Sequence, residues 1–204
     1  MNMEYAVYTK TLPASPLCKR EILRYAGMRA EPSAELSVLL EECLAEVADK
    51  LVYRLCYGEL PLTCADDGAL DLGFCKIGSE SLQKNLAGCH SIVLFAATVG
   101  LEIDRLIARY STLSPTKALL FQAIGTERIE SLCDAFEKEL REEKAKQGQM
   151  IRPRFSPGYG DLSIETQREL FAALDCPRRI GLTLNQSLLM SPSKSVTAII
   201  GVGR

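Results

Sequence analysis

The residues best suited to bind a ligand lie in one short stretch, Arg154-Phe-Ser-Pro-Gly-Tyr-Gly-Asp161. A guanidinium forms two parallel hydrogen bonds with a carboxylate, and the face of a tyrosine ring suits a flat base or a cation. Prolines at 153 and 157 forbid a helix and stiffen the backbone, so Arg154 and Tyr159 are held in place at little cost in conformational entropy. On residue chemistry alone, the stretch is either a ligand site or a proline-rich structural turn.

The sequence contains few other groups arranged for catalysis. It has one histidine, His90, so a Ser-His or Cys-His centre would depend on that residue. No glycine-rich nucleotide motif or nucleophile elbow occurs. The eight cysteines include no Cys-x-x-Cys pair, the spacing of zinc ribbons and thioredoxin-type centres. We interpret them as small buried hydrophobic residues; the alternative is a metal site built from Cys56, Cys64, Cys75 and Cys89.

Charge and hydropathy exclude several classes of protein. The chain has 24 Lys+Arg and 26 Asp+Glu, a net charge of −2, which argues against binding to nucleic acid. Its longest apolar stretch, Ile92–Ala97, has six residues, whereas a membrane span needs about 20. The N-terminus lacks the basic and apolar regions of a secretory signal. We therefore expect a cytoplasmic protein with no membrane partner.

Helical and alternating patterns predict the elements that must position the 154–161 stretch. Ser114-Pro115 is a strong helix start, and Gly125 weakens the middle of that helix enough to allow a break. Helices and strands follow one another without a regular βαβ rhythm, which favours an α+β fold. The patterns predict helices at 16–26, 33–58, 79–86, 101–110, 114–146 and 164–174, a short strand or hairpin within 66–78, and strands at 91–99, 180–184 and 195–202.

Three blocks of sequence resemble the activation (reactivation) domain of cobalamin-dependent methionine synthase. They are the 154–161 stretch with Ile164, Gln167 and Leu170-Phe171 after it, Arg179-Ile-Gly-Leu-Thr-Leu184, and Ser187-Leu-Leu-Met190 followed by Pro192-Ser-Lys-Ser195-Val-Thr-Ala. The resemblance is strong across residues 150–202 and diffuse before them. It implies a bent, mainly antiparallel sheet with flanking helices, forming a single activation-like domain over residues 1–204 in a stand-alone short form.

The resemblance also implies an S-adenosylmethionine site. The family binds this ligand through an R-x-x-x-G-Y motif, which Arg154 to Tyr159 match. Arg154 would pair with the ligand's carboxylate, and Ser156 would offer backbone contacts. Gly158 would let the backbone approach the ligand, and Tyr159 would pack on it and favour its positive charge.

Two further positions follow from the same alignment. The family has an acidic residue for the ligand's ammonium on the long helix before the motif. Asp134 aligns with it, and Glu130, one turn earlier, is the competitor. The family also uses a tyrosine in the last strand, where this sequence has Ile200. That contact is therefore missing or supplied by another residue.

The family's activity is the reductive methylation of inactive cobalamin. The resemblance implies an accessory subunit, non-catalytic or co-catalytic, for a methionine synthase, with S-adenosylmethionine as methyl donor for cob(I)alamin. Its partners would be the cobalamin-binding module of that enzyme or a related corrinoid protein, which supplies the cobalamin, and a flavodoxin-like electron donor. The alternative is a docking or scaffold protein for a corrinoid methyltransferase that has lost S-adenosylmethionine binding.

Overall fold

The structure is a computed structural model, and it describes residues 5–64 and 69–204. In chain order the elements are β1 (Val7–Thr11), α1 (Lys19–Tyr25), α2 (Ala34–Val47), β2 (Arg54–Pro61), β3 (Thr63–Cys64), β4 (Leu70–Asp71), β5 (Lys76–Ile77), α3 (Glu80–Asn85), β6 (Cys89–Thr98), α4 (Glu102–Leu113), α5 (Pro115–Ala145), β7 (Met150–Ile151), α6 (Thr166–Leu174), α7 (Cys176–Ile180), β8 (Thr183–Leu184), β9 (Met190–Ser191) and β10 (Ser195–Gly203). Among the described residues, no helix is both long and apolar enough to cross a membrane.

A five-stranded antiparallel sheet in the order β1-β2-β6-β10-β7 forms the centre of the molecule. The strand predicted at 91–99 is β6, which lies between β2 and β10 and is buried from Ser91 onwards. Two smaller sheets, β3-β4-β5 and β8-β9, flank it. The predicted hairpin within 66–78 corresponds to β4 and β5, apart from residues 65–68, which lie outside the described residues. The α+β class and the mainly antiparallel sheet are confirmed.

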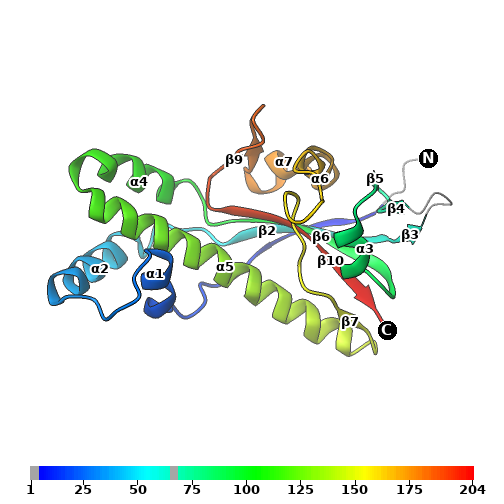
Figure 1. Cartoon of the computed structure of the whole chain (residues 1–204), viewed down its shortest axis with the longest axis horizontal. Helices are drawn as coiled ribbons and strands as arrows, with labels where there is room; N and C mark the ends of the chain where they lie inside the picture. Colours follow the sequence, from blue (N-terminus) through cyan, green and yellow to red (C-terminus); the bar gives the residue numbers. More distant parts are fainter. Residues whose placement is uncertain (1–4, 65–68) are drawn as a thin grey trace.

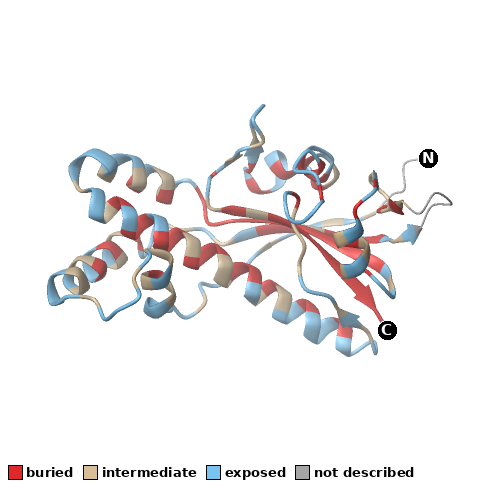
Figure 2. Ribbon diagram, viewed as in Figure 1, coloured by how far each residue is buried: buried red, intermediate tan, exposed pale blue. Residues whose placement is uncertain are grey.

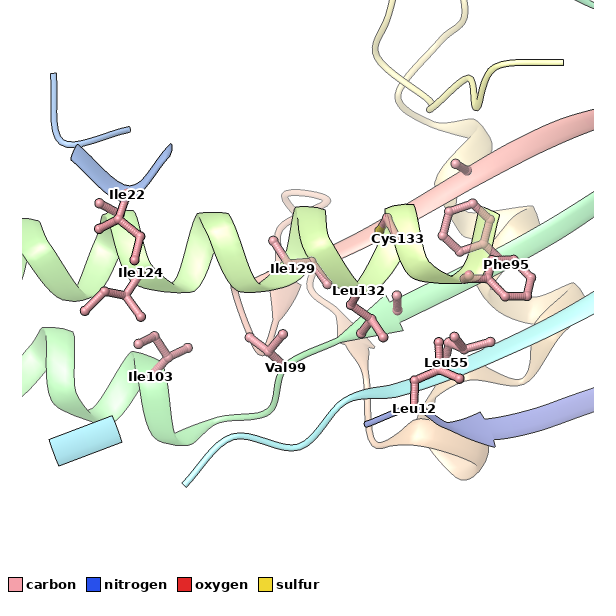
Figure 3. Packing of buried hydrophobic residues seen from close by; sticks show 14 of the residues in the cluster. Leu12, Ile22, Leu55, Phe95, Val99, Ile103, Ile124, Ile129, Leu132 and Cys133 are labelled. Atoms are coloured by element: carbon pink, nitrogen blue, oxygen red, sulfur yellow. The ribbon is translucent and has the colours of Figure 1, made fainter. Parts of the chain in front are cut away.

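Helices cover both faces of this sheet, so its central strands β6 and β10 are buried on two sides (Figures 1 and 2). One core lies between the sheet and α1, α2, α4 and α5, and Figure 3 shows its packing around Phe95, Leu132 and Ile124. The other lies between the opposite face and α3, α6 and α7. Adjacent residues of β10 pack into different cores: Ile199 lies in the second core and Ile200 in the first. Successive side chains of a strand point to opposite faces of the sheet, which explains this alternation.

The long helix α5 runs unbroken across one face of the sheet (Figure 1). As predicted, the Ser114 hydroxyl caps its first turn by accepting from the backbone of Lys117. The break allowed at Gly125 does not occur. A β-carbon there would lie 2.8 Å from both Ile103 Cγ1 and Lys194 Cγ, so the glycine lets α4 and the residue before β10 approach α5 closely. Tertiary packing therefore outweighs the weak helical propensity of glycine.

The prediction of one helix from 33 to 58 was wrong in its second half. Helix α2 ends at Val47, and residues from Arg54 onwards form β2 between β1 and β6. Leu51 and Leu55 continue the helical spacing by chance, while Leu55 and Cys56 pack on opposite faces of the sheet. A short apolar run does not by itself distinguish a helix from a doubly covered strand.

Two further predictions need correction near the C-terminal end. The strand predicted at 180–184 is the end of helix α7, then a turn at Gly181 with φ of 70°, then the two-residue strand β8. Helix α6 begins at Thr166, not at 164, and the Ser163 hydroxyl accepts from the backbone of Glu165 in the turn before it.

Strand β1 was not predicted at all, because an edge strand buries little apolar surface.

Candidate functional site

A cleft of about 460 Å³ opens at the edge of the central sheet. Strand β7 pairs with β10 at Val202 and Gly203, and the cleft lies over the first half of β10, between α5, α6 and the irregular segment after β7. Its size is typical of a small-molecule site. It is lined by Glu130, Arg154, Phe155, Ser156, Pro157, Tyr159, Gln167, Met190, Ser195, Val196 and Thr197.

The proline-rich segment is fastened to β10 by backbone hydrogen bonds. Arg152 N–H donates to the carbonyl of Gly201 at 2.8 Å, and Phe155 and Ile199 exchange two bonds of 2.9 Å. The segment therefore continues the sheet edge in an extended conformation, as Pro153 and Pro157 favour. These bonds fix the backbone on both sides of Arg154 and so determine where its side chain begins.

The end of the segment is a tight turn that docks on α3. Gly158 and Gly160 have φ of 91° and 55°, which glycine adopts without steric cost. Asp161 then caps α3, accepting from the Ser79 hydroxyl at 2.5 Å and from the backbone of Glu80 and Ser81 at 2.8 and 3.1 Å. The bond from Ser79, with those from the two backbone N–H groups, holds the pKa of Asp161 well below its usual range. The turn that carries Tyr159 is thus anchored at its far end.

Arg154 is held by three carboxylates of α5. Its Nη2 is 2.6 Å from Glu130, and its Nη1 is 2.8 Å from Asp134 and also donates to Glu137. The three acids follow one face of the helix at spacings of four and three residues. Burial lowers the pKa of the guanidinium, but the bonds to Asp134 and Glu137 outweigh it, so the net pKa is raised. These contacts use three of its five N–H donors.

The cluster of charges around Arg154, at this end of the cleft, carries a surplus of negative charge. Three carboxylates surround one guanidinium, and Glu130 is the acid among them that lines the cleft. Such a site suits a ligand that has a carboxylate for the remaining arginine donors and one or more positive charges for the acids. Tyr159 lies at the rim with 68% of its surface exposed, where its ring face is available to a flat or cationic group.

The structure brings most of the residues singled out from the sequence to one place. Arg154, Ser156 and Tyr159 line the cleft, and Gly158 belongs to the same turn. Asp134 does not line it: its carboxylate pairs with Arg154, and the residue borders a separate hollow on the outer side of α5. Glu130, its competitor, is the one of the two that lines the cleft.

Sequence reasoning assigned no role to the other wall of the cleft. Gln167 on α6, Met190 on β9 and residues Ser195 to Thr197 on β10 form it. All belong to the blocks that carry the family resemblance, and this was the available signal. Ile200, at the position expected for a tyrosine, is fully buried in the core on the α5 side of the sheet.

The cysteines do not gather into a metal site in the part of the chain that the structure describes. No three His, Cys, Asp or Glu side chains there could hold a metal ion together; the side chain of Cys64 lies outside the described residues. Cys43, Cys56 and Cys133 are fully buried among apolar residues. Cys56 lies on β2 and not on the helix predicted for it.

Comparison with known proteins gives a consistent result. The sequence model of a family described as "Vitamin B12 dependent methionine synthase, activation domain" matches residues 82–203. Among solved structures, the chain is similar to the crystal structure of the MetH reactivation domain bound to AdoHcy, with a TM-score of 0.68 and 15% sequence identity over 98% of this chain and 79% of that one. At this identity the likeness shows the fold alone. No curated protein matches.

Proposed function

Because the chain belongs to the family of the vitamin B12-dependent methionine synthase activation domain, we propose that its cleft binds S-adenosylmethionine and that it acts as an accessory subunit in the reductive reactivation of a cobalamin-dependent methionine synthase. The observation that carries this proposal is the pairing of Arg154 with Glu130 at one end of the cleft. S-adenosylmethionine has a carboxylate, an ammonium, a sulfonium and a neutral nucleoside, and this end offers a partner for each of its charges.

The residues divide the ligand's charges between them. Two N–H groups of Arg154 remain for the carboxylate after its bonds to α5 are counted. Glu130 accepts from the ammonium, and the exposed ring of Tyr159 packs against the sulfonium end. The MetH reactivation domain was solved with AdoHcy bound, a compound that differs from S-adenosylmethionine by the transferred methyl group. This supports the ligand class.

The protein needs no acid or base for this role. When bound, S-adenosylmethionine supplies a methyl group to reduced cobalamin carried by a partner. The chain's own residues contribute position: the anchored segment from Arg152 to Asp161 holds the ligand with little freedom. Orientation of two reactants supplies up to about 7–11 kcal/mol of a barrier.

Exposed apolar side chains around the cleft support docking of a cobalamin-binding module there. Tyr159, Ile164 and Leu189 are all large and exposed. Ile164 packs against the Gly158 turn, and Leu189 precedes Met190 of the cleft wall. A partner that covers this rim would exclude water from the ligand and bury these side chains. A flavodoxin-like protein is the proposed electron donor.

A second candidate, a scaffold that docks a corrinoid protein without binding S-adenosylmethionine, rests on two observations. Ile200 occupies the position of the family tyrosine and is fully buried. Arg154 is already satisfied in part by three carboxylates, with which a ligand carboxylate must compete. Under this alternative, the partner binds equally well with and without the ligand.

Calorimetric titration with S-adenosylmethionine distinguishes the accessory subunit from the scaffold protein. We expect binding by the unmodified protein and a loss of about 1.5–3 kcal/mol for Arg154→Ala, the scale of a charge-assisted hydrogen bond. Arg154→Lys keeps the charge but not the fork geometry and should also lose affinity. Arg168→Ala, an exposed arginine on α6 outside the cleft, is the matched control. Absence of binding by the unmodified protein, with normal docking of a cobalamin module, would establish the scaffold instead.

A further inference from the structure

Two residues that line the cleft each have a buried side-chain oxygen with no hydrogen-bond partner among the described residues. These oxygens are the side-chain amide oxygen of Gln167 and the hydroxyl of Thr197. Only 5% of Gln167 and 2% of Thr197 is exposed, yet both residues line the cleft. Buried polar groups in folded proteins are nearly always paired, so two unpaired ones on residues that line the same cleft point to a partner from outside the chain.

The two side chains belong to the same side of the sheet. Along β10, Thr197 shares a face with Ile199, two residues later. Ile199 packs in the core formed with α6, where it is grouped with Leu170 and Phe171. The hydroxyl of Thr197 is therefore directed toward the layer that contains α6, and Gln167 lies on that helix. The wall they form is neutral, whereas the charged end of the cleft is formed by α5 and Arg154.

We infer that Gln167 and Thr197 bind the neutral, hydrogen-bonding nucleoside part of the ligand, while Arg154 and Glu130 bind its charged amino-acid part. The inference rests on the proposed function and adds to it the orientation of the ligand and the residues that recognise its nucleoside. An amide oxygen accepts from an N–H or O–H group, and a threonine hydroxyl both donates and accepts. Together they match the amine edge of a base or the hydroxyls of a ribose.

The test replaces each polar group with an apolar one of the same shape. We expect Thr197→Val and Gln167→Met each to weaken S-adenosylmethionine binding about fivefold to tenfold, the change in affinity that the loss of one hydrogen bond causes. Methylthioadenosine, which has the nucleoside but neither the amino-acid charges nor the sulfonium, should lose affinity by the same factor. Thr197→Ser keeps the hydroxyl, and its affinity for both ligands should be within about twofold of that of the unmodified protein. Thr166→Val, a buried α6 neighbour outside the cleft wall, should leave both affinities unchanged.

A second measurement separates ligand recognition from a structural role. Replacing an unpaired buried polar group with an apolar one is neutral or stabilising, so the urea unfolding midpoint of ligand-free Thr197→Val should equal or exceed that of the unmodified protein. A lower midpoint would overturn the inference, because it would mean that the hydroxyl stabilises the fold.

Four possible binding results decide between the inference and the proposed function. Variants that bind both ligands normally overturn the inference alone and leave the proposed function in place. A loss for S-adenosylmethionine without a loss for methylthioadenosine, or no binding of millimolar methylthioadenosine by the unmodified protein, overturns the assignment to the nucleoside. Failure of the unmodified protein to bind S-adenosylmethionine removes the proposed function, and the inference with it.

Discussion

Replacing Gly160 with alanine should destabilise the protein and weaken ligand binding, because this residue closes the turn that carries Tyr159. Gly160 has φ of 55°, and a β-carbon there would lie 2.7 Å from Ser81 Oγ and 2.9 Å from Ser81 Cβ. The hydroxyl can rotate away, but the β-carbon of Ser81 is fixed to helix α3. The turn and the helix must therefore separate, and Asp161, which caps α3 from the next position, must move with the turn.

The expected cost has two parts. A left-handed conformation costs an alanine about 1–2 kcal/mol relative to glycine. Overpacking against a fixed neighbour costs about 1–3 kcal/mol more. The free energy of unfolding should therefore fall by about 2–5 kcal/mol, a large part of the usual 5–15 kcal/mol of a domain.

Urea denaturation and calorimetry with S-adenosylmethionine measure the two effects, and Gly148→Ala supplies the control. Gly148 has φ of 70° but no atom within 4 Å of a β-carbon, so its substitution carries the backbone cost alone, about 1–2 kcal/mol. Removing the obstacle with Ser81→Gly should recover the steric part in a double-mutant cycle. Equal costs for the two alanine variants, or no coupling to Ser81, would refute the packing argument.

Two further predictions concern charges outside the cleft. Asp161→Asn should lower stability at pH 7 more than at pH 3. The folded-state pKa of this carboxyl is depressed, so its contribution to stability is present above the ordinary aspartate pKa of about 3.9 and is lost as the pH falls toward the folded-state pKa. Urea unfolding at both pH values measures this, and a loss of stability that does not depend on pH contradicts it. Arg128→Met should lower the free energy of unfolding by about 3–5 kcal/mol, because it leaves the buried Glu127 carboxylate without its cation. Adding Glu127→Gln in the same chain should recover part of that loss. Urea unfolding measures both effects, and an Arg128→Met variant as stable as the unmodified protein contradicts the prediction.

The strongest local signals in the sequence predicted their elements well. The continuous apolar run after Ser91 identified the central strand, and the cap at Ser114 identified the start of α5. The patterns at 79–86 and within 66–78 predicted α3 and the hairpin of β4 and β5. The weaker signals failed where tertiary pairing decides the outcome, as at Arg54–Pro61, whose spacing suits a helix but whose neighbours on both sides are strands.

The sequence alone predicted a stiff stretch suited to a ligand at Arg154, because prolines and glycines constrain the backbone locally and the residues of the R-x-x-x-G-Y pattern are contiguous. Only the tertiary structure decided which groups face that motif. Glu130 and not Asp134 lines the cleft, while Gln167 reaches it from α6 and Thr197 from β10. Side chains on separate elements meet through strand pairing and helix packing, and the spacing of residues along the chain does not encode those distances.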